Sequence, residues 1–243
     1  MLDNKIVLIT HATHFVGGPA AREMAARGAR VVCHDESFTD AAAREAFAAE
    51  RAGVETTDKQ TPADLLADMT ERYGRVDVLV NNDAFPALRA SVEEADLEDM
   101  RRTLEALVVQ PFALAQAVLP GMRERQSGKI IFVTSAAPFH GLPNYSMYVT
   151  GRGATNALTL SLAKEVARHN IQVNALAPNF VESPTYFPPE LLANPEAKAK
   201  IVKNIPLGRL GKPQEAAATI VFLASPGADF ITGHVLPFAG GWA

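Results

Sequence analysis

The feature that most constrains the fold of this chain is a series of short apolar runs separated by longer helical stretches. The runs are rich in Val and Ile and nearly continuous. Strands that are buried on both faces of a parallel sheet have this composition. The sequence therefore predicts strands at 6–9, 29–34, 76–80, 129–134, 171–176 and 234–238, and a weaker strand at 53–56.

The stretches between these runs carry helix signals. One of them ends at Gly28, a residue type that commonly follows a helix. Another has Thr61 as its cap and Pro62 at its first helical position, and it ends at Gly74. Strands and helices thus alternate along the chain, which is typical of a doubly wound, Rossmann-like parallel sheet. We expect an α/β fold with a single domain over 1–243.

Composition limits the partners and the compartment. The formal net charge of −4 argues against a nucleic-acid surface, which would carry a basic patch. No apolar run approaches the roughly 20 residues of a membrane span, and the amino-terminal segment lacks the apolar core of a signal peptide. A single cysteine, Cys33, excludes an internal disulfide and fits a reducing compartment. We therefore expect a cytoplasmic protein that binds neither nucleic acid nor membranes.

Five blocks of the chain resemble recurrent blocks of the short-chain dehydrogenase/reductase superfamily. They are GRVDVLVNN (74–82), SGKIIFVTS (127–135), SLAKEVARHNIQVNALAP (161–178), IPLGRLGKPQEAA (205–217) and ITGHVLPFAGG (231–241). These blocks occur in order over nearly the whole chain. The resemblance implies the Rossmann-like fold of the superfamily, and homotetramers formed through helices near 103–126 and 148–168.

The loop after the first expected strand departs from the superfamily. The pattern Thr-Gly-x-x-x-Gly-x-Gly is replaced by THATHFVG over 10–17, with His11 and Phe15 at two glycine positions. Those glycines let backbone N–H groups approach the pyrophosphate of a dinucleotide. The Phe15 ring would project where the nicotinamide lies. We interpret the loop as a blocked cofactor site; the alternative is a variant loop that binds the cofactor in another pose.

The catalytic residues of the superfamily are kept with one exchange. The superfamily uses Tyr-x-x-x-Lys with a Ser upstream, and here Tyr148 is followed by Arg152 and preceded by Ser135 at the usual spacing. Residues four apart share one helical face. Because Arg keeps its charge in proteins, it would favour the tyrosinate form of Tyr148. The alternative for Tyr148 taken alone is a packed aromatic side chain.

Two further positions depart from the superfamily. Leu107 stands where the superfamily commonly has an Asn of a proton relay, and Leu can neither donate nor accept a hydrogen bond. Asp83 replaces the Ala of an Asn-Asn-Ala-Gly stretch. We expect Asp83 to orient Arg152 through a charge-assisted bond. The alternatives are a helix-core Leu and a solvated loop Asp.

This set of departures resembles the halohydrin dehalogenases, which are cofactor-free relatives of the short-chain dehydrogenases. Ser135, Tyr148 and Arg152 carry the resemblance, together with CHDESF (33–38) and TSAAPF (134–139). It implies a carbon–halide lyase that converts vicinal halohydrins to epoxides with release of halide and a proton. In reverse, such enzymes open epoxides with halide, azide, cyanide or nitrite. Neither a cofactor nor a metal is implied.

The resemblance also assigns roles. Tyr148, activated by Arg152, takes the proton of the substrate hydroxyl, and Ser135 fixes the substrate oxygen. The halide pocket takes the place of the nicotinamide, and backbone N–H groups after Asn179 could face the anion. Simple packing is the alternative for the apolar residues of this Pro-rich loop. The expected walls are Phe15, Pro178, Asn179, Phe180, Val181 and Tyr186.

Two rival functions remain open on the sequence. One is an NAD(P)-dependent short-chain oxidoreductase with a variant glycine loop, which must accommodate Phe15, Leu107 and Arg152 together. The other is a non-enzymatic protein that binds a small metabolite and regulates a partner, which would not need the catalytic residues intact. Nicotinamide binding distinguishes the first rival from a dehalogenase, and halide release distinguishes the second.

Overall fold

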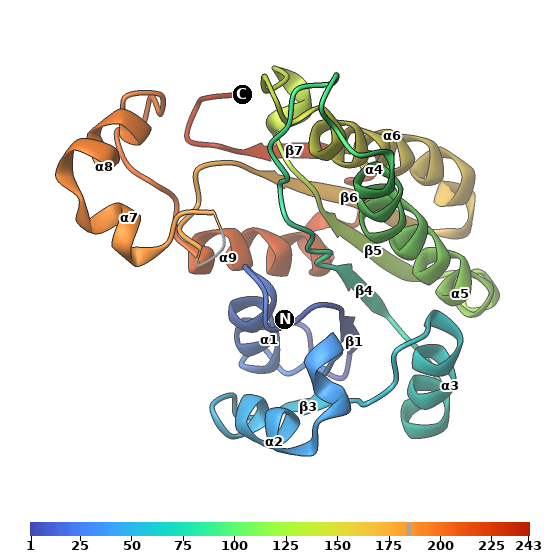
Figure 1. The fold of residues 1–243 in the computed structure, drawn as a ribbon. Helices are drawn as coiled ribbons and strands as arrows, with labels where there is room; N and C mark the ends of the chain where they lie inside the picture. Colours follow the sequence, from blue (N-terminus) through green and yellow to red (C-terminus); the bar gives the residue numbers. More distant parts are fainter. Residues whose placement is uncertain (184–185) are drawn as a thin grey trace.

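The protein is built around a parallel β-sheet of seven strands (Figure 1). A computed structural model describes residues 1–183 and 186–243. The strand order is β3-β2-β1-β4-β5-β6-β7, and every neighbouring pair is parallel. The strands are β1 (Ile6–Ile9), β2 (Arg30–Cys33), β3 (Val54–Thr56), β4 (Val78–Asn81), β5 (Gly128–Val133), β6 (Ile171–Pro178) and β7 (Val235–Phe238).

This order confirms the predicted Rossmann-like fold, and each predicted strand is present within two residues of its expected bounds. The chain winds outward from β1 in one direction through β2 and β3, and in the other through β4 to β7. Ligands of such sheets bind at the carboxyl ends of the strands, where the winding direction reverses. In this protein that point lies between β1 and β4.

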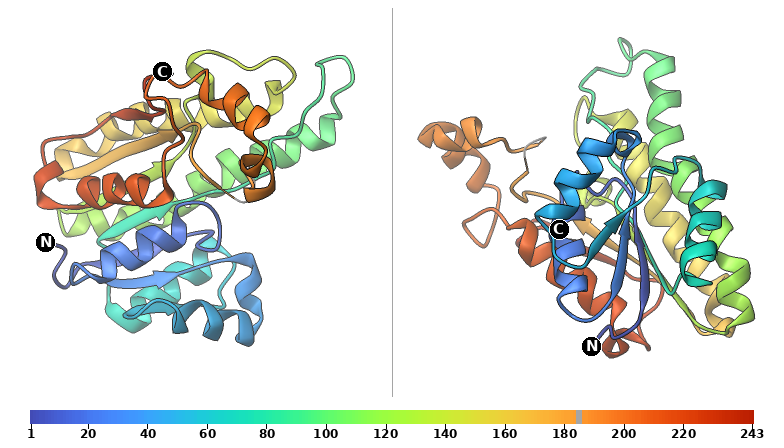
Figure 2. Two further views of the ribbon diagram at one scale, coloured as in Figure 1. Left: turned by 90° about the vertical axis from the view of Figure 1, so that its left-hand side faces the viewer. Right: turned by 90° about the horizontal axis from the view of Figure 1, so that it is seen from below.

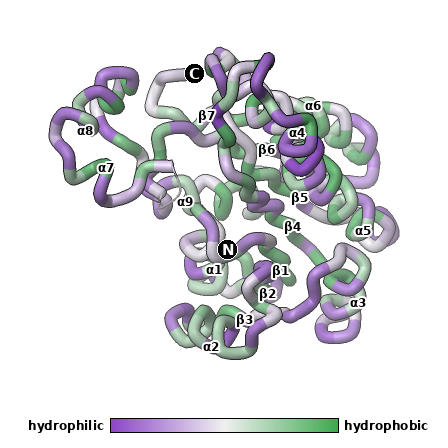
Figure 3. Tube along the Cα trace, in the orientation of Figure 1, coloured by the Kyte–Doolittle hydropathy of each residue, from purple (hydrophilic) through white to green (hydrophobic). Residues whose placement is uncertain are grey.

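Helices cover both faces of the sheet (Figure 2). Alternate residues of β1 show the two layers, because Val7 and Ile9 belong to one apolar core and Ile6 and Leu8 belong to the other. One face carries α1 (Gly17–Ala25), α2 (Ala41–Ala49) and α9 (Pro213–Ala224). The other carries α3 (Pro62–Tyr73), α5 (Gln110–Glu124) and α6 (Ser146–Val166). Hydrophobic residues follow the central strands, whereas α4 (Leu97–Leu104) is largely hydrophilic (Figure 3).

The helix signals of the sequence have the expected structural form in α3. The Thr61 hydroxyl accepts the backbone N–H of Asp64 at 3.1 Å, and Pro62 occupies the first helical position. Gly74 ends the helix in the left-handed conformation with φ of 75°. Such a conformation costs glycine nothing because glycine has no Cβ. Gly28, with φ of 90°, follows the carboxyl end of α1 in the same way.

The helical run Leu97–Glu124 contains an apolar stretch that is long enough to cross a membrane by length and composition alone. However, its inner face packs into the core beneath it through Leu114, Val118 and Met122. Val109 and Phe112 on the outer face are about half exposed. We interpret the run as a core helix of the domain that carries an exposed apolar strip.

The segment between β6 and α9 leaves the sheet. The Pro-rich stretch after β6 contains α7 (Pro189–Ala193), and α8 (Pro195–Val202) follows it directly. Both helices project from the body of the domain (Figure 1). The part of this segment that follows β6 lies over the carboxyl edge of the sheet, and it therefore forms one wall of the site described next.

Candidate active site

Helix α6 presents three buried polar side chains to the end of β5. Tyr148, Arg152 and Asn156 lie four residues apart, so they share one face of the helix. The Asn156 amide donates to the main-chain carbonyl of Ser135 at 3.3 Å. This bond fixes α6 against the turn that carries Ser135. Ser135, Tyr148 and Arg152, the residues that the sequence predicted to be catalytic, line one cavity.

Two main-chain carbonyls hold the guanidinium of Arg152. Nη1 donates to the Val133 carbonyl at 3.0 Å, and Nη2 donates to the Asp83 carbonyl at 2.9 Å. The guanidinium carbon lies 5.4 Å from the centroid of the Tyr148 ring. Burial lowers the pKa of Arg152, but Tyr148, Tyr186 and Asp83 outweigh it and raise the pKa above its usual value. Arg152 is therefore a permanent cation beside Tyr148.

The hydroxyl of Ser135 has a defined role in hydrogen bonding. Its Oγ accepts the backbone N–H of Ala137 at 3.1 Å, and the residue is buried. A serine hydroxyl has one hydrogen to donate. Since the main chain already occupies an acceptor site of Oγ, the hydrogen remains available for a ligand oxygen in the cavity.

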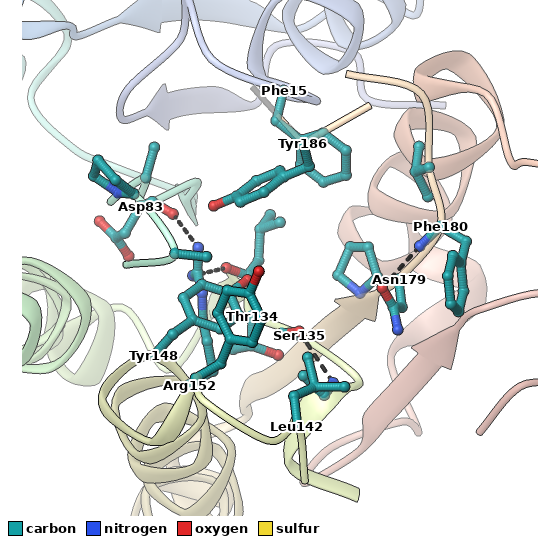
Figure 4. Close-up of a pocket in the computed structure, with 18 of the residues that line it drawn as sticks. Phe15, Asp83, Thr134, Ser135, Leu142, Tyr148, Arg152, Asn179, Phe180 and Tyr186 are labelled. Carbon is teal, nitrogen blue, oxygen red and sulfur yellow. Dashed lines mark hydrogen bonds between the residues drawn. The ribbon is translucent and has the colours of Figure 1, made fainter. Parts of the chain in front are cut away.

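These residues face a cavity of about 530 Å³ at the carboxyl edge of the sheet (Figure 4). Its walls come from the ends of β1, β4, β5 and β6 and from α6. All of the predicted site residues line it, namely Phe15, Asp83, Ser135, Tyr148, Arg152, Pro178, Asn179, Phe180, Val181 and Tyr186.

One wall of the cavity is aromatic. Phe15 has φ of 48°, a left-handed conformation that is uncommon for a bulky residue, and it lines the cavity as the sequence predicted. Tyr186 also lines the cavity, and its hydroxyl donates to the Phe85 carbonyl at 3.2 Å. Burial and the nearby Tyr148 raise the pKa of Tyr186 to about 12. Tyr186 therefore stays protonated at neutral pH and is unsuited to act as a base.

The loop after β6 differs in one respect from the prediction. The backbone N–H of Phe180 donates to Oδ1 of Asn179 at 3.0 Å, so it is not free to face an anion. Phe180 also has a positive φ, of 54°, and its ring packs edge-on against Trp242 with centroids 5.6 Å apart. The side-chain oxygen of Asn179 thus accepts a bond from the main chain, and its side-chain nitrogen is the group that can donate to a ligand.

Asp83 acts through different atoms from those expected. The predicted contact was an ion pair between its carboxylate and Arg152, whereas Arg152 is bonded to the main-chain carbonyl of Asp83. The carboxylate is directed to the glycine-loop position, where Oδ1 lies 3.5 Å from Nδ1 of His11. Asp83 is buried rather than solvated. A sequence identifies a carboxylate but not which of its atoms meets a neighbour.

Leu107 lies in an irregular helical turn. Residues Glu105–Val109 form a π-helical segment between α4 and α5. The side chain of Leu107 packs with Tyr148 and Ala137 in a small apolar cluster. The side chain of Leu107 is therefore a buried core residue, which was one of the two interpretations of the sequence. Its main-chain carbonyl is occupied by the Thr155 hydroxyl.

Other residues of the site were not found by sequence reasoning. Thr134, Leu142 and Tyr145 also line the cavity. The Asn82 amide donates to the carbonyls of His11 and His14 at 2.9 and 2.8 Å, and it thereby braces the glycine-loop segment. A signal for this contact existed, because His11 and Asn82 both follow expected strands that are neighbours in doubly wound sheets.

The residues at the expected dinucleotide site do not fit that cofactor. In this fold an acidic residue at the end of the second strand binds the adenosine ribose. Asp35 has that place, but its two carboxylate oxygens accept four hydrogen bonds, from the backbone N–H and hydroxyl groups of Thr13 and Ser37. Phe15 lines the cavity at the position of a superfamily glycine. Within 1–183 and 186–243, no group of three His, Cys, Asp or Glu residues could hold a metal ion.

Comparisons with known proteins place the chain in two steps. A family model described as "Enoyl-(Acyl carrier protein) reductase" matches residues 13–243. The 3-oxoacyl-[acyl-carrier-protein] reductase FabG of Thermotoga maritima is 33% identical over 99% of this chain and 98% of its own length. The chain therefore belongs to the short-chain dehydrogenase/reductase superfamily.

Solved structures narrow the assignment. One described as "Dehalogenation enzyme" is 51% identical, with a TM-score of 0.97 over 100% of this chain and 99% of its own. Another, halohydrin dehalogenase (HheC) bound to ethyl (2S)-oxiran-2-ylacetate, is 40% identical, with a TM-score of 0.94 over 98% of this chain and 96% of its own. Within the superfamily, the chain belongs to the halohydrin dehalogenases, as the sequence resemblance indicated.

Proposed function

We propose that this enzyme converts vicinal halohydrins to epoxides without a cofactor and opens epoxides with halide or small anions such as azide, cyanide and nitrite. The observation that carries the proposal is the arrangement of Ser135, Tyr148 and Arg152 around a cavity that Phe15, at the position of a superfamily glycine, also lines. We infer from it a proton-transfer site combined with a blocked cofactor site. The similar halohydrin dehalogenase was solved with an oxirane ligand, which supports an epoxide as the substrate or product of this enzyme.

The reaction begins with removal of a proton. Ser135 donates its hydroxyl hydrogen to the substrate oxygen and holds it beside Tyr148. Tyr148, as tyrosinate next to the Arg152 cation, takes the substrate hydroxyl proton. General base catalysis of this kind contributes roughly 10²–10⁴ to a rate. The cation lowers the cost of charge on the phenolate because it is fixed in place by two main-chain carbonyls.

The alkoxide oxygen then attacks the neighbouring carbon. A carbon–oxygen bond forms, the carbon–halogen bond breaks, and the halide leaves with the bonding electrons. The nucleophile is part of the same molecule, so the protein needs only to orient it. The groups that can receive the halide are the amide nitrogen of Asn179 and the ring edges of Phe15 and Tyr186. Epoxide opening follows the same path in reverse, with Tyr148 returning the proton.

The first experiment is an assay of halide and proton release from 1,3-dichloro-2-propanol with no nicotinamide present. Release that disappears in Tyr148→Phe supports the proposal. The reductase alternative rests on the FabG relatives, and titration with NADH and NADPH tests it. Nicotinamide binding without halide release across a panel of halohydrins would overturn the proposal. A chain with neither activity would agree with the non-enzymatic alternative.

We also propose that the enzyme is a cytoplasmic homotetramer. Val109 and Phe112 of the run Leu97–Glu124, and Leu160 of α6, are exposed apolar side chains on the two helices through which the superfamily is expected to associate. Burying them against another copy would remove apolar area from water. Sedimentation equilibrium tests the oligomer, with Phe112→Glu expected to shift it to smaller species. Cell fractionation tests the compartment.

A further inference from the structure

The carboxylate of Asp83 and the imidazole of His11 form a largely buried pair near Arg152. Nδ1 of His11 lies 3.5 Å from Oδ1 of Asp83, and their side chains are 16% and 3% exposed. In the part of the chain that the structure describes, neither atom has a hydrogen-bond partner. A buried carboxylate is costly unless a cation or hydrogen-bond donors compensate it. The imidazole is in place to supply that compensation.

The surroundings of His11 favour its protonated form. Its Nε2 faces Oε1 of Glu36 at 3.9 Å, so each ring nitrogen faces a carboxylate. Only the imidazolium carries a hydrogen on both nitrogens. Burial lowers the pKa of His11, but Asp83, Glu36 and Asp35 outweigh it and raise the pKa above its usual 6.5.

Two other histidines lie near this ring. His34 lies edge-on to His11 with centroids 5.6 Å apart, and His14, on the same loop, is 6.4 Å away. Burial and the charge on His11 lower the pKa of His34, whose Nε2 contacts the Gln60 amide oxygen at 3.3 Å. The surroundings therefore favour the charged form of His11 and the neutral form of His34.

Asp83 connects this cluster to the catalytic cation. Its main-chain carbonyl accepts a hydrogen bond from Arg152, and its carboxylate contributes to the raised pKa of Arg152. Asp83 thus contacts His11 through its carboxylate and Arg152 through its main-chain carbonyl. Tyr148 and Tyr186 face Arg152 from the cavity side. A change at His11 would reach Tyr148 through this sequence of contacts.

We propose that His11 is a positioning residue for the reaction, because its imidazolium balances the Asp83 carboxylate and so leaves the charge of Arg152 directed at Tyr148. This inference rests on the proposed dehalogenase function. Without the imidazolium, the negative charge of Asp83 would be balanced by Arg152 alone. Less positive charge would then support the tyrosinate, and the base would become active only at higher pH.

The test compares pH–rate profiles of halide release from 1,3-dichloro-2-propanol. His11→Asn removes the charge but suits the left-handed backbone at this residue, where φ is 46°. His14→Asn is the matched control, because His14 is an exposed side chain on the same loop. We expect His11→Asn to move the rising limb of the kcat profile upward by about one pH unit, which is roughly a tenfold loss below the limb. We expect KM to change little and His14→Asn to match the wild type.

A second variant separates charge balance from loss of structure. His11→Asn/Asp83→Asn removes both charges, and the limb should return toward its wild-type pH. Titration of His11 by NMR adds a readout that does not depend on activity: its pKa should fall in Asp83→Asn. The inference is overturned by a His11→Asn profile that superimposes on the wild type. Equal losses in both single histidine variants without a pH shift would also overturn it, as would an unchanged His11 titration in Asp83→Asn.

These results remain distinct from a failure of the proposed function. Halide release by the wild-type enzyme establishes the dehalogenase activity whatever His11 does. Absence of release by the wild type, in contrast, rejects the proposed function itself, while the NMR titration still decides whether Asp83 and His11 form a charged pair.

Discussion

The polar side chains in the two halves of the carboxyl edge of the sheet differ in whether the protein itself satisfies their hydrogen bonds. Beyond the end of β2, both carboxylate oxygens of Asp35 accept hydrogen bonds from Thr13 and Ser37. Beyond the end of β1, Phe15 lines the cavity. At the end of β5 and on the adjoining helix α6, Ser135 and Tyr148 line the cavity. In the first half the carboxylate is occupied by the protein itself, whereas the second half carries the hydroxyl groups that we propose act on the substrate.

The largest expected effect is the loss of halide release on substitution of Tyr148, in the second half. Tyr148→Phe removes the base and should lower halide release by about 10³-fold or more. The melting temperature should change by only a few degrees, because the ring still packs against Leu107 and Ala137. Tyr186→Phe is the comparison, and it should cost less than about tenfold because the raised pKa of Tyr186 keeps that hydroxyl protonated. Equal losses in the two variants would reject Tyr148 as the base.

Arg152→Lys tests the support of the base. A lysine ammonium is a compact charge without the planar fork of the guanidinium, so it cannot span the Val133 and Asp83 carbonyls in the same way. We expect kcat to fall about 10- to 100-fold. We also expect a change in the pH at which kcat rises. The measurement is kcat against pH. A profile that keeps its wild-type shape would count against Arg152 as the activator of Tyr148.

Asp35→Ala tests the other half, and here stability should change rather than catalysis. Four hydrogen bonds to a buried carboxylate are lost, and the backbone N–H groups of Thr13 and Ser37 are left without it. We expect the free energy of unfolding to fall by about 2–3 kcal/mol, with kcat within about threefold of the wild type. Chemical denaturation and the halide assay measure the two quantities. A large loss of kcat in a folded variant would show that the halves are not separate.

The smallest expected effect is a difference in pH dependence between wild type and His11→Asn. The folded-state pKa of His11 is raised, so its contribution to stability is fully present below pH 6.5 and is lost as the pH rises through the folded-state value. The stability difference between the two proteins should therefore shrink by about 1 kcal/mol or less as pH increases above 6.5. Denaturant unfolding at a series of pH values measures it. A difference that grows with pH would contradict the assigned sign.

Sequence reasoning predicted the elements and the grouping of Ser135, Tyr148 and Arg152 around one cavity, because both follow from local patterns. Buried strands require apolar runs, and Tyr148 and Arg152 meet because a helix repeats every 3.6 residues. What the sequence did not reveal depends on which atom of a residue faces which neighbour. Examples are the main-chain contact of Asp83 to Arg152, the bond from Phe180 to Asn179, and the π-helical turn around Leu107. Tertiary contacts decide these features, and they involve residues far apart in the chain.

The two carbonyls that hold Arg152 have a consequence for altering this enzyme. They belong to the main chain at the ends of β5 and β4, and they are therefore present whatever side chains surround the cavity. Substitutions among the cavity's apolar walls, such as Leu142 or Val181, can change the volume of the cavity without removing the contacts that hold the Arg152 guanidinium. The position of this cation and the shape of the cavity are thus set by separate parts of the chain, which makes the cavity a suitable target for redesign.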